Sequence, residues 1–166
     1  MTDIREKVLY LHGLFDEKFL ENLNQIMEDD AISDMGSYNM LADRKWFESE
    51  EIGTSILNAI PETYKFTRVL PSLRFIIYPS GGFIAPHVDG VRFDAVTQHP
   101  STHSFLLYMI DTLEGGATEF LTAIRGGEVV ETIQPKRGSI LIFPHNIPHQ
   151  GTGVDTSKIL LRGDLY

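Results

Sequence analysis

From Leu73 onward the chain is a succession of short apolar runs separated by turns rich in Gly, Pro and Asp, at a spacing of roughly ten residues. The runs cover residues 73–78, 83–88, 104–110, 118–123, 128–133, 139–143, 149–151 and 157–162. Short runs of this kind predict strands, and no helical pattern interrupts them. The fold expected is therefore mainly β, a jelly roll in which two antiparallel sheets face each other.

Two amphipathic helices are predicted before these strands. The first runs from Asp16, whose side chain suits a helix N-cap, to Glu28, with apolar residues recurring at helical spacing. The second begins at Ser49, carries acidic residues in its first turn and ends before Pro61. We expect both helices to pack against the outside of the sheet as support.

The rest of the first half has weaker signals. Residues 8–11 suggest a short strand, and residues 29–43 are expected to form a loop. Trp46 and Phe47 are interpreted as core or staple residues in preference to a binding platform. The change from helices to strands near residue 70 occurs without a linker.

The length and composition agree with a single globular unit. The chain has 166 residues, of which 42% are hydrophobic and 22% are charged. We expect one domain over residues 1–166, with helical support in 1–70 and a jelly-roll core in 71–166. There is no cysteine, which excludes disulfides, thiolate zinc sites and a thiol nucleophile.

The charge and the N-terminus bear on partners and location. The net charge of −9, without a clustered basic run, disfavours a nucleic acid as partner. The N-terminal segment is too charged for a signal peptide, and no apolar run approaches the ~20 residues that a membrane helix needs. We therefore expect a cytoplasmic protein with no membrane partner.

The segment 74–90, RFIIYPSGGFIAPHVDG, carries the first chemical motif. On a strand His87 and Asp89 point to the same side, because side chains alternate and only Val88 faces the other way. An imidazole and a carboxylate side by side offer two corners of an octahedral metal site, and a second His would complete the face typical of non-haem Fe(II). His-x-Asp alone is common by chance, and a polar loop at a strand end is the alternative.

Four histidines are candidates for the third ligand: His99, His103, His145 and His149. The first two lie in the loop that follows the motif, too near it to be presented from the opposite wall. The other two flank Pro148 at the end of an apolar strand. We favour His149 over His145, with a surface histidine as the alternative for either.

A 2-His-1-carboxylate Fe(II) centre usually needs a co-substrate that supplies electrons. A dicarboxylate such as 2-oxoglutarate chelates iron at one end and needs a cation at the other. Lys158 and Arg162 lie four residues apart on the last predicted strand and so face the same side. A carboxylate would supply the compensating charge that a buried cation needs. A solvated position is the alternative for one of the two.

From Arg74 to Tyr166 the chain resembles the Fe(II)/2-oxoglutarate-dependent oxygenases of the prolyl 4-hydroxylase type. The matching segments are YPSGGFIAPHVDG (78–90), LLYMIDTLEGGATEF (106–120), PKRGSILIFPHNIPHQG (135–151) and KILLRGDLY (158–166). The resemblance implies a double-stranded β-helix with Fe(II) on His87, Asp89 and His149. It also implies 2-oxoglutarate as co-substrate, O2 as reactant and ascorbate as a further candidate cofactor.

The resemblance also implies roles around the co-substrate. It puts Lys158, nine residues past His149, in the position of the 2-oxoglutarate anchor, with Tyr108 bonded to the same distal carboxylate. Tyr78 and Thr118 would line the pocket. Arg162 faces inward as well, because it lies four residues from Lys158 on the same predicted strand, so both cations remain candidates for the anchor. The Asn usual in this family after the segment's aliphatic pair is missing, since Tyr108 is followed by Met-Ile-Asp.

The expected activity is hydroxylation of a C–H bond, in a prolyl residue of a protein or peptide. A free amino acid or other small molecule is the alternative substrate, and a non-catalytic, cupin-like metal-binding module is the alternative class. The loop 91–102, with Arg92, His99 and His103, is a candidate substrate gate, although solvated loop residues are the simpler interpretation. Adhesion through the tripeptide at 162–164 and nucleic-acid demethylation are both disfavoured.

Overall fold

Two antiparallel sheets face each other in the computed structural model, which describes residues 3–34 and 39–166. The seven-stranded sheet has the order β1 (Leu9–Leu11), β10 (Ile140–Pro144), β7 (His103–Tyr108), β12 (Lys158–Leu165), β5 (Ser72–Tyr78), β4 (Asp43–Glu48) and β2 (Ile32–Asp34). The five-stranded sheet has the order β3 (Met40–Leu41), β6 (Phe83–His87), β11 (His149–Gly151), β8 (Thr118–Leu121) and β9 (Val129–Ile133). All eight strands predicted from residue 73 onward are present, and the jelly-roll prediction is confirmed.

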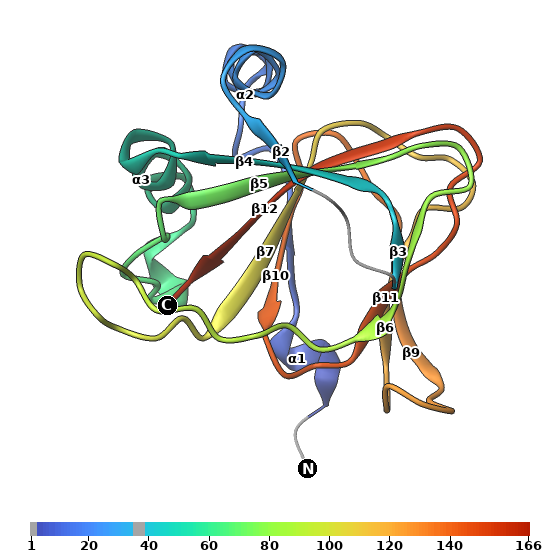
Figure 1. Cartoon of the computed structure of the whole chain (residues 1–166). Helices are drawn as coiled ribbons and strands as arrows, with labels where there is room; N and C mark the ends of the chain where they lie inside the picture. The colour runs from blue at the N-terminus through green and yellow to red at the C-terminus, as the bar shows by residue number, and fades with distance from the viewer. Residues whose placement is uncertain (1–2, 35–38) are drawn as a thin grey trace.

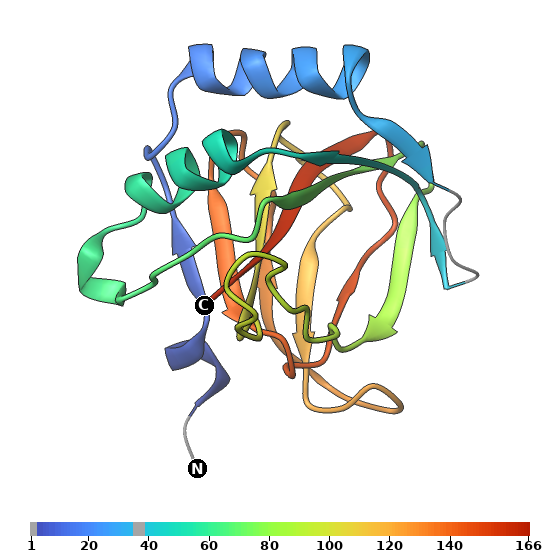
Figure 2. The same ribbon diagram turned by 60° about the vertical axis from the view of Figure 1, so that its left-hand side comes forward.

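Two long helices cover the outside of the seven-stranded sheet (Figure 1). Helix α2 (Glu17–Asp29) is capped by Asp16, whose carboxylate accepts a hydrogen bond from a first-turn amide, and α3 (Glu50–Ala59) is capped in the same way by Ser49. Figure 2 shows α2 lying across the top of the sheet. Both predicted helices are confirmed as support. A short helix α1 (Ile4–Lys7) and a 3-10 turn (Glu62–Tyr64) complete the helical part.

Alternation along the central strands divides the core into two layers. On β7, Phe105 and Leu107 face the helices, whereas Leu106 and Tyr108 face the space between the sheets. The outer layer also includes Leu20, Leu23, Met27, Ile52, Ile56, Leu73, Phe75, Ile140, Ile142 and Leu161. The inner layer also includes Ile76, Tyr78, Phe120, Leu141, Phe143 and Leu160. The same alternation places every second residue of β12, from 158 to 164, on the inner face.

The prediction of a loop over residues 29–43 is wrong for the residues that the structure describes. This segment contains β2, β3 and the first residue of β4. All three residues of β2 are exposed because it lies at the edge of the sheet, so its sequence shows no apolar alternation. Residues 35–38 of the predicted loop lie outside the described residues.

Strand β4 was not predicted, and it divides the two aromatic residues at its centre. Phe47 stacks on Phe75 with ring centroids 5.3 Å apart and belongs to the outer layer, as expected. Trp46 is half-buried and faces the other side, beneath two arginine side chains. The expectation of a core or staple role is therefore confirmed for Phe47, while Trp46 lies beside the cavity described below.

Strands from the first 70 residues join both sheets. Strands β1, β2 and β4 belong to the larger sheet, and β3 pairs with β6 of the smaller one. Because strands from the first 70 residues and from the rest of the chain share both sheets, we propose that residues 1–166 form one domain. No helix among the described residues is long and apolar enough to cross a membrane. The cytoplasmic location stays a prediction.

Candidate functional site

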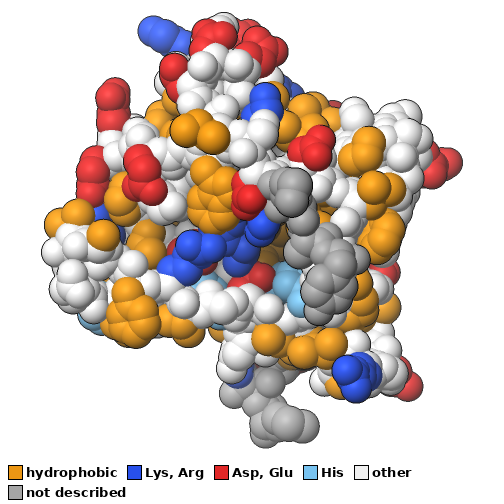
Figure 3. Space-filling model, in the orientation of Figure 1, with side chains coloured by type: hydrophobic (Ala, Val, Ile, Leu, Met, Phe, Trp, Pro, Cys, Tyr) orange, Lys and Arg blue, Asp and Glu red, His pale blue; other side chains and the backbone are white. Residues whose placement is uncertain are grey.

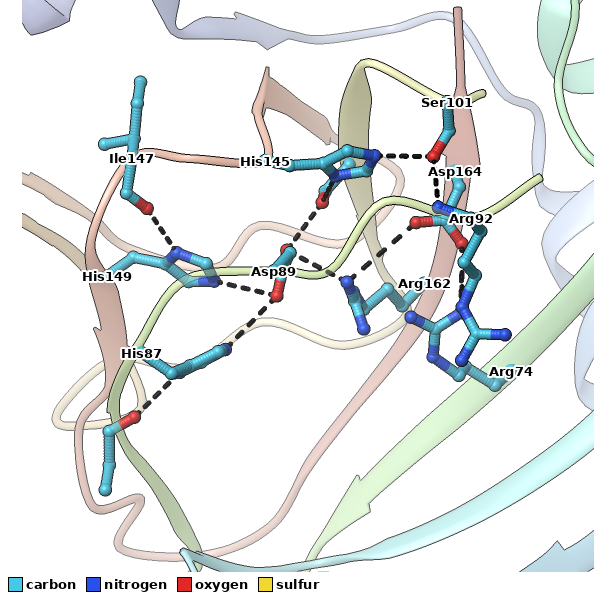
Figure 4. A network of polar contacts seen from close by, with 12 residues as sticks. Arg74, His87, Asp89, Arg92, Ser101, His145, Ile147, His149, Arg162 and Asp164 are labelled. Carbon is cyan, nitrogen blue, oxygen red and sulfur yellow. Dashed lines mark hydrogen bonds and ion pairs between the residues drawn. The ribbon is translucent and has the colours of Figure 1, made fainter. Parts of the chain in front are cut away.

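Two neighbouring strands of the smaller sheet, β6 and β11, bring three metal-ligating side chains together. His87 is the last residue of β6 and His149 the first of β11, and the two are paired directly across the antiparallel ladder. Asp89 lies just past the end of β6, and its Oδ1 atom is 3.4 Å from Nε2 of His87 and 3.6 Å from Nε2 of His149 (Figure 4). One ligand atom from each residue lies within 4.8 Å of the others.

Backbone carbonyl groups determine which nitrogen of each imidazole faces this point. Nδ1 of His87 lies 2.7 Å from the carbonyl oxygen of Ala85, and Nδ1 of His149 lies 2.8 Å from that of Ile147. A carbonyl oxygen can only accept, so each Nδ1 carries the proton. Both Nε2 lone pairs therefore point toward Asp89, the arrangement found in most histidine metal sites.

Burial and charge keep His149 and Asp89 in the protonation states that a metal needs. Burial lowers the pKa of His149 to about 4, so its imidazole is neutral at neutral pH. Burial opposes the ionisation of Asp89, but the charge of Arg162 and the contacts with His87, His149 and Ser104 hold its pKa well below the usual range. Two neutral imidazoles and one carboxylate fit a divalent metal such as Fe(II).

The second oxygen of Asp89 is held by other side chains. Oδ2 accepts a 2.5 Å hydrogen bond from the hydroxyl of Ser104, and Arg162 lies 3.0 Å away. The only proton of that hydroxyl goes to Asp89, so Ser104 must accept from Nδ1 of His145, 2.8 Å away. Nε2 of His145 is in turn 2.7 Å from the hydroxyl of Ser101. This chain orients the carboxylate so that Oδ1 faces the two imidazoles.

The four candidate histidines separate clearly in space. His149 joins the group of three, whereas His145 lies behind Asp89 in the chain of hydrogen bonds (Figure 4). Both are buried, so the alternative of a surface histidine is wrong for each. His99 stacks on Tyr166, His103 meets Phe66 edge to face, and neither belongs to the group of three ligands.

A narrow pocket extends from the two imidazoles along the inner face of the larger sheet. It is lined by Tyr78, Thr118, Lys158 and Arg162, together with Ile76, Ile84, His87, Leu106, His149, Gln150, Gly151 and Leu160. Lys158 is buried, and its ammonium nitrogen lies 4.8 Å from the ring centre of Tyr78 and 5.9 Å from that of Tyr108. Burial lowers the pKa of Lys158 to about 7, and no carboxylate of the described residues opposes that shift.

The predicted wall residues lie around this ammonium group. The hydroxyl of Tyr108 is 2.7 Å from that of Thr118, which lines the pocket, so Tyr108 lies one layer behind the wall. Burial raises the pKa of both Tyr78 and Tyr108, so their hydroxyls keep their protons. An anion entering the pocket would meet neutral donors and the ammonium of Lys158, whereas Arg162, which also lines the pocket, is paired with Asp89.

Arg162 also faces the interior, as its parity predicts, but its observed partner is Asp89. The tripeptide at 162–164 lies on β12 with its Asp164 side chain completely buried, which removes it as an adhesion motif. The sequence analysis missed three residues near the site: Ser104, Arg74 and Asp164. Arg74 could have been found from strand parity, since it shares a face with Ile76 and Tyr78.

Comparison with known proteins agrees with this geometry. Residues 73–163 match the family model described as the 2OG-Fe(II) oxygenase superfamily. Among solved structures, a prolyl-4-hydroxylase from Pseudomonas putida has a TM-score of 0.66 at 13% identity, covering 96% of this chain and 91% of that one. A collagen prolyl hydroxylase from Paramecium bursaria Chlorella virus-1, solved as a 2OG complex, has a TM-score of 0.68 at 17% identity, with coverage of 96% and 94%.

A third solved structure adds a peptide complex. A prolyl hydroxylase from Trichoplax adhaerens, bound to a peptide fragment of the hypoxia inducible factor oxygen degradation domain, has a TM-score of 0.65 at 14% identity, with coverage of 96% and 83%. At these identities the likeness establishes the double-stranded β-helix fold and no more. A search of curated proteins found no match to the sequence. The family match spans more than half of the chain, so this protein belongs to the 2OG-Fe(II) oxygenase superfamily, as a dioxygenase that uses Fe(II) and 2-oxoglutarate.

Proposed function

We propose that this dioxygenase hydroxylates a prolyl residue in a protein or peptide, with His87, Asp89 and His149 as the iron ligands. The observation that carries the proposal is the convergence of these three side chains at one end of a pocket that holds a buried cation. A cupin-like metal module without a co-substrate would have no use for that cation. When bound, Fe(II) would activate O2 with two electrons supplied by 2-oxoglutarate, which is released as succinate and CO2, and the protein supplies geometry and exclusion of water.

Lys158 is the proposed anchor for the distal carboxylate of 2-oxoglutarate. A buried ammonium without an anionic partner is costly, and a carboxylate would offset that cost with a charge-assisted hydrogen bond. Thr118 would donate a second hydrogen bond from the pocket wall, with Tyr108 behind it as its partner. Arg162 is engaged with Asp89, so its proposed role is to hold that iron ligand in place.

The apolar walls of the pocket would order the co-substrate and exclude water. Ile76, Leu106 and Leu160 line it together with Lys158 and the two imidazoles. Tyr78 is paired with Lys158 across the ladder, so its ring limits the movement of the lysine side chain. The anchored co-substrate would therefore reach the two imidazoles in one orientation.

The substrate would enter through a wider cavity on the other side of the ligands. This cavity has a volume of about 420 Å³ and is hollowed into the face that Figure 3 shows. Val88 and Val91 line it with exposed side chains. Exposed apolar side chains beside the ligands suit a residue presented by a longer chain better than an enclosed small molecule.

The test is turnover with prolyl peptides and with free proline. Purified protein with Fe(II), ascorbate and 2-oxoglutarate should release succinate in proportion to peptide that has gained one oxygen atom, measured by mass spectrometry. His87→Ala should abolish both products, whereas His12→Ala, at an exposed histidine that lines neither cavity, should retain them. Substrate-independent succinate release, with no peptide or amino acid oxidised, would contradict the prolyl assignment. Failure to bind 2-oxoglutarate would contradict the site assignment.

A further inference from the structure

Three arginine side chains meet at the inner end of the wider cavity. Arg74, Arg92 and Arg162 all line it, and together they form what we call the arginine cluster. Arg74 is buried on β5, directly across the ladder from Arg162 on β12. Arg92 comes from the loop after the iron motif, and its side chain is 44% exposed. Figure 4 shows the three guanidinium groups on the side of Asp89 away from the imidazoles.

The positions of these guanidinium groups are restricted by their neighbours. Arg74 and Arg92 both lie over the ring of Trp46, at 4.8 Å and 4.9 Å from its centre. Both also approach Oδ2 of Asp164, at 3.3 Å for Arg74 and 3.7 Å for Arg92. An aromatic ring and a buried carboxylate therefore hold the two groups side by side, as in a site built for a planar anion.

The cluster carries more positive charge than the surrounding carboxylates neutralise. A fourth arginine on the cavity wall, Arg44, is paired with Asp34. Among the described residues, the three guanidinium groups of the cluster meet two carboxylates, Asp89 and Asp164. A bound Fe(II) and the 2-oxoglutarate dianion have equal and opposite charges, so filling the cofactor site leaves the surplus in place. Burial and the charges of Arg162 and Arg92 lower the pKa of Arg74 to about 9, opposed by Asp164.

A purely structural role explains only part of this arrangement. Asp164 is completely buried and needs a cation, which Arg74 supplies. Asp89 is partnered by Arg162. Arg92 is then an additional cation, placed on the same ring and the same carboxylate but open to the cavity. The overall charge of −9 makes this local surplus of positive charge distinctive.

We propose that the arginine cluster binds a carboxylate of the substrate, and that the enzyme therefore selects prolyl substrates with an acidic group next to the reacting ring. The inference rests on the proposed function, since it concerns the same cavity. The carboxylate has two sources, an acidic side chain beside the proline or the α-carboxylate of a terminal or free proline. The cluster adjoins the iron ligands through the Arg162–Asp89 contact, which places the anion close to the reacting carbon.

The experiment measures binding, so that turnover is not required. Protein loaded with Mn(II) and 2-oxoglutarate is titrated by calorimetry with two matched pairs of probes. The first pair is acetyl-Glu-Pro-Gly-amide and acetyl-Gln-Pro-Gly-amide, and the second is acetylproline and acetylprolinamide. We expect the acidic member of at least one pair to bind about tenfold or more tightly than its amide, and the pair that responds identifies the source of the carboxylate.

Variants separate the cluster from general electrostatics. Arg92→Gln should reduce the preference for the acid to near unity, and Arg92→Lys should retain part of it. Arg125→Gln removes the same charge from an exposed position on the β8–β9 connection and should leave the preference unchanged. Equal binding of acid and amide, an unchanged preference in Arg92→Gln, or no binding of any probe would overturn the inference. If the wild-type protein does not bind Mn(II) or 2-oxoglutarate, the proposed function itself is overturned.

Discussion

The ammonium nitrogen of Lys158 lies 4.8 Å from the ring centre of Tyr78, its partner across the β5–β12 ladder, in a pocket that opens toward His149. Burial alone lowers the pKa of this lysine to about 7. The protein therefore holds a cation in an environment that favours the neutral form, which is costly unless an anion occupies the pocket.

Lys158→Met should weaken 2-oxoglutarate binding and stabilise the protein that lacks it. Loss of about 3 kcal/mol of charge-assisted bonding corresponds to ~100-fold in the dissociation constant. Removal of a buried cation should raise the free energy of unfolding by on the order of 1–4 kcal/mol. Calorimetry and urea unfolding measure the two quantities, and Lys136→Met, at an exposed position, should change neither. A loss of stability without a change in affinity would show that the lysine is structural.

The affinity for 2-oxoglutarate should fall as the pH rises above about 7. The free protein loses the lysine proton near that pH, whereas the bound dicarboxylate raises the pKa toward its ordinary value. Binding is therefore at full strength below pH 7 and weakens through the alkaline range, with uptake of a proton. Calorimetry at pH 8 in buffers of different ionisation enthalpy measures that proton. The Lys158→Met variant should show neither effect, and a pH-independent affinity in the wild type would contradict the assignment.

His149→Ala should remove Fe(II) binding, because it deletes one of three ligands. His145→Ala should weaken it by no more than about 10–100-fold, since His145 acts only through Ser104 on the orientation of Asp89. Anaerobic titration with Fe(II) measures both affinities. Full affinity in the His149 variant together with none in the His145 variant would reverse the ligand assignment.

Leu23→Ala and Ile56→Ala should each lower the free energy of unfolding by about 2–5 kcal/mol, because both side chains are completely buried between the helices and the sheet. Urea unfolding measures the change. Leu113→Ala, at a side chain that is 92% exposed, should stay within about 0.5 kcal/mol of the wild type. Fe(II) affinity should be unchanged in all three, since none of these residues contacts the ligands. Wild-type stability in the first two would show that the helices do not contribute to the core.

Local patterns in the sequence predicted the strands from residue 73 onward and the two long helices. These elements have local signals: apolar runs between turns, helical spacing, and caps at Asp16 and Ser49. Strand parity also placed Lys158 and Arg162 correctly on the inner face, because alternation is a property of the single strand. The polar strands β2 and β4 were not predicted, because they are defined by backbone pairing with neighbouring strands. Such pairing does not require a particular amino-acid composition.

The contacts of these inward-facing residues depend on how distant strands pair and pack. Pairing of the neighbouring strands β6 and β11 puts His149 directly across from His87. His145 instead lies behind Asp89 and is connected to it through the hydroxyl of Ser104. Pairing of β12 with β5 placed Arg162 beside Arg74 and engaged it with Asp89, leaving Lys158 as the cation of the narrow pocket that has no carboxylate partner among the described residues. Such contacts join residues that are 15 to 88 positions apart, and their energies depend on burial and distance, which no local pattern in a sequence encodes.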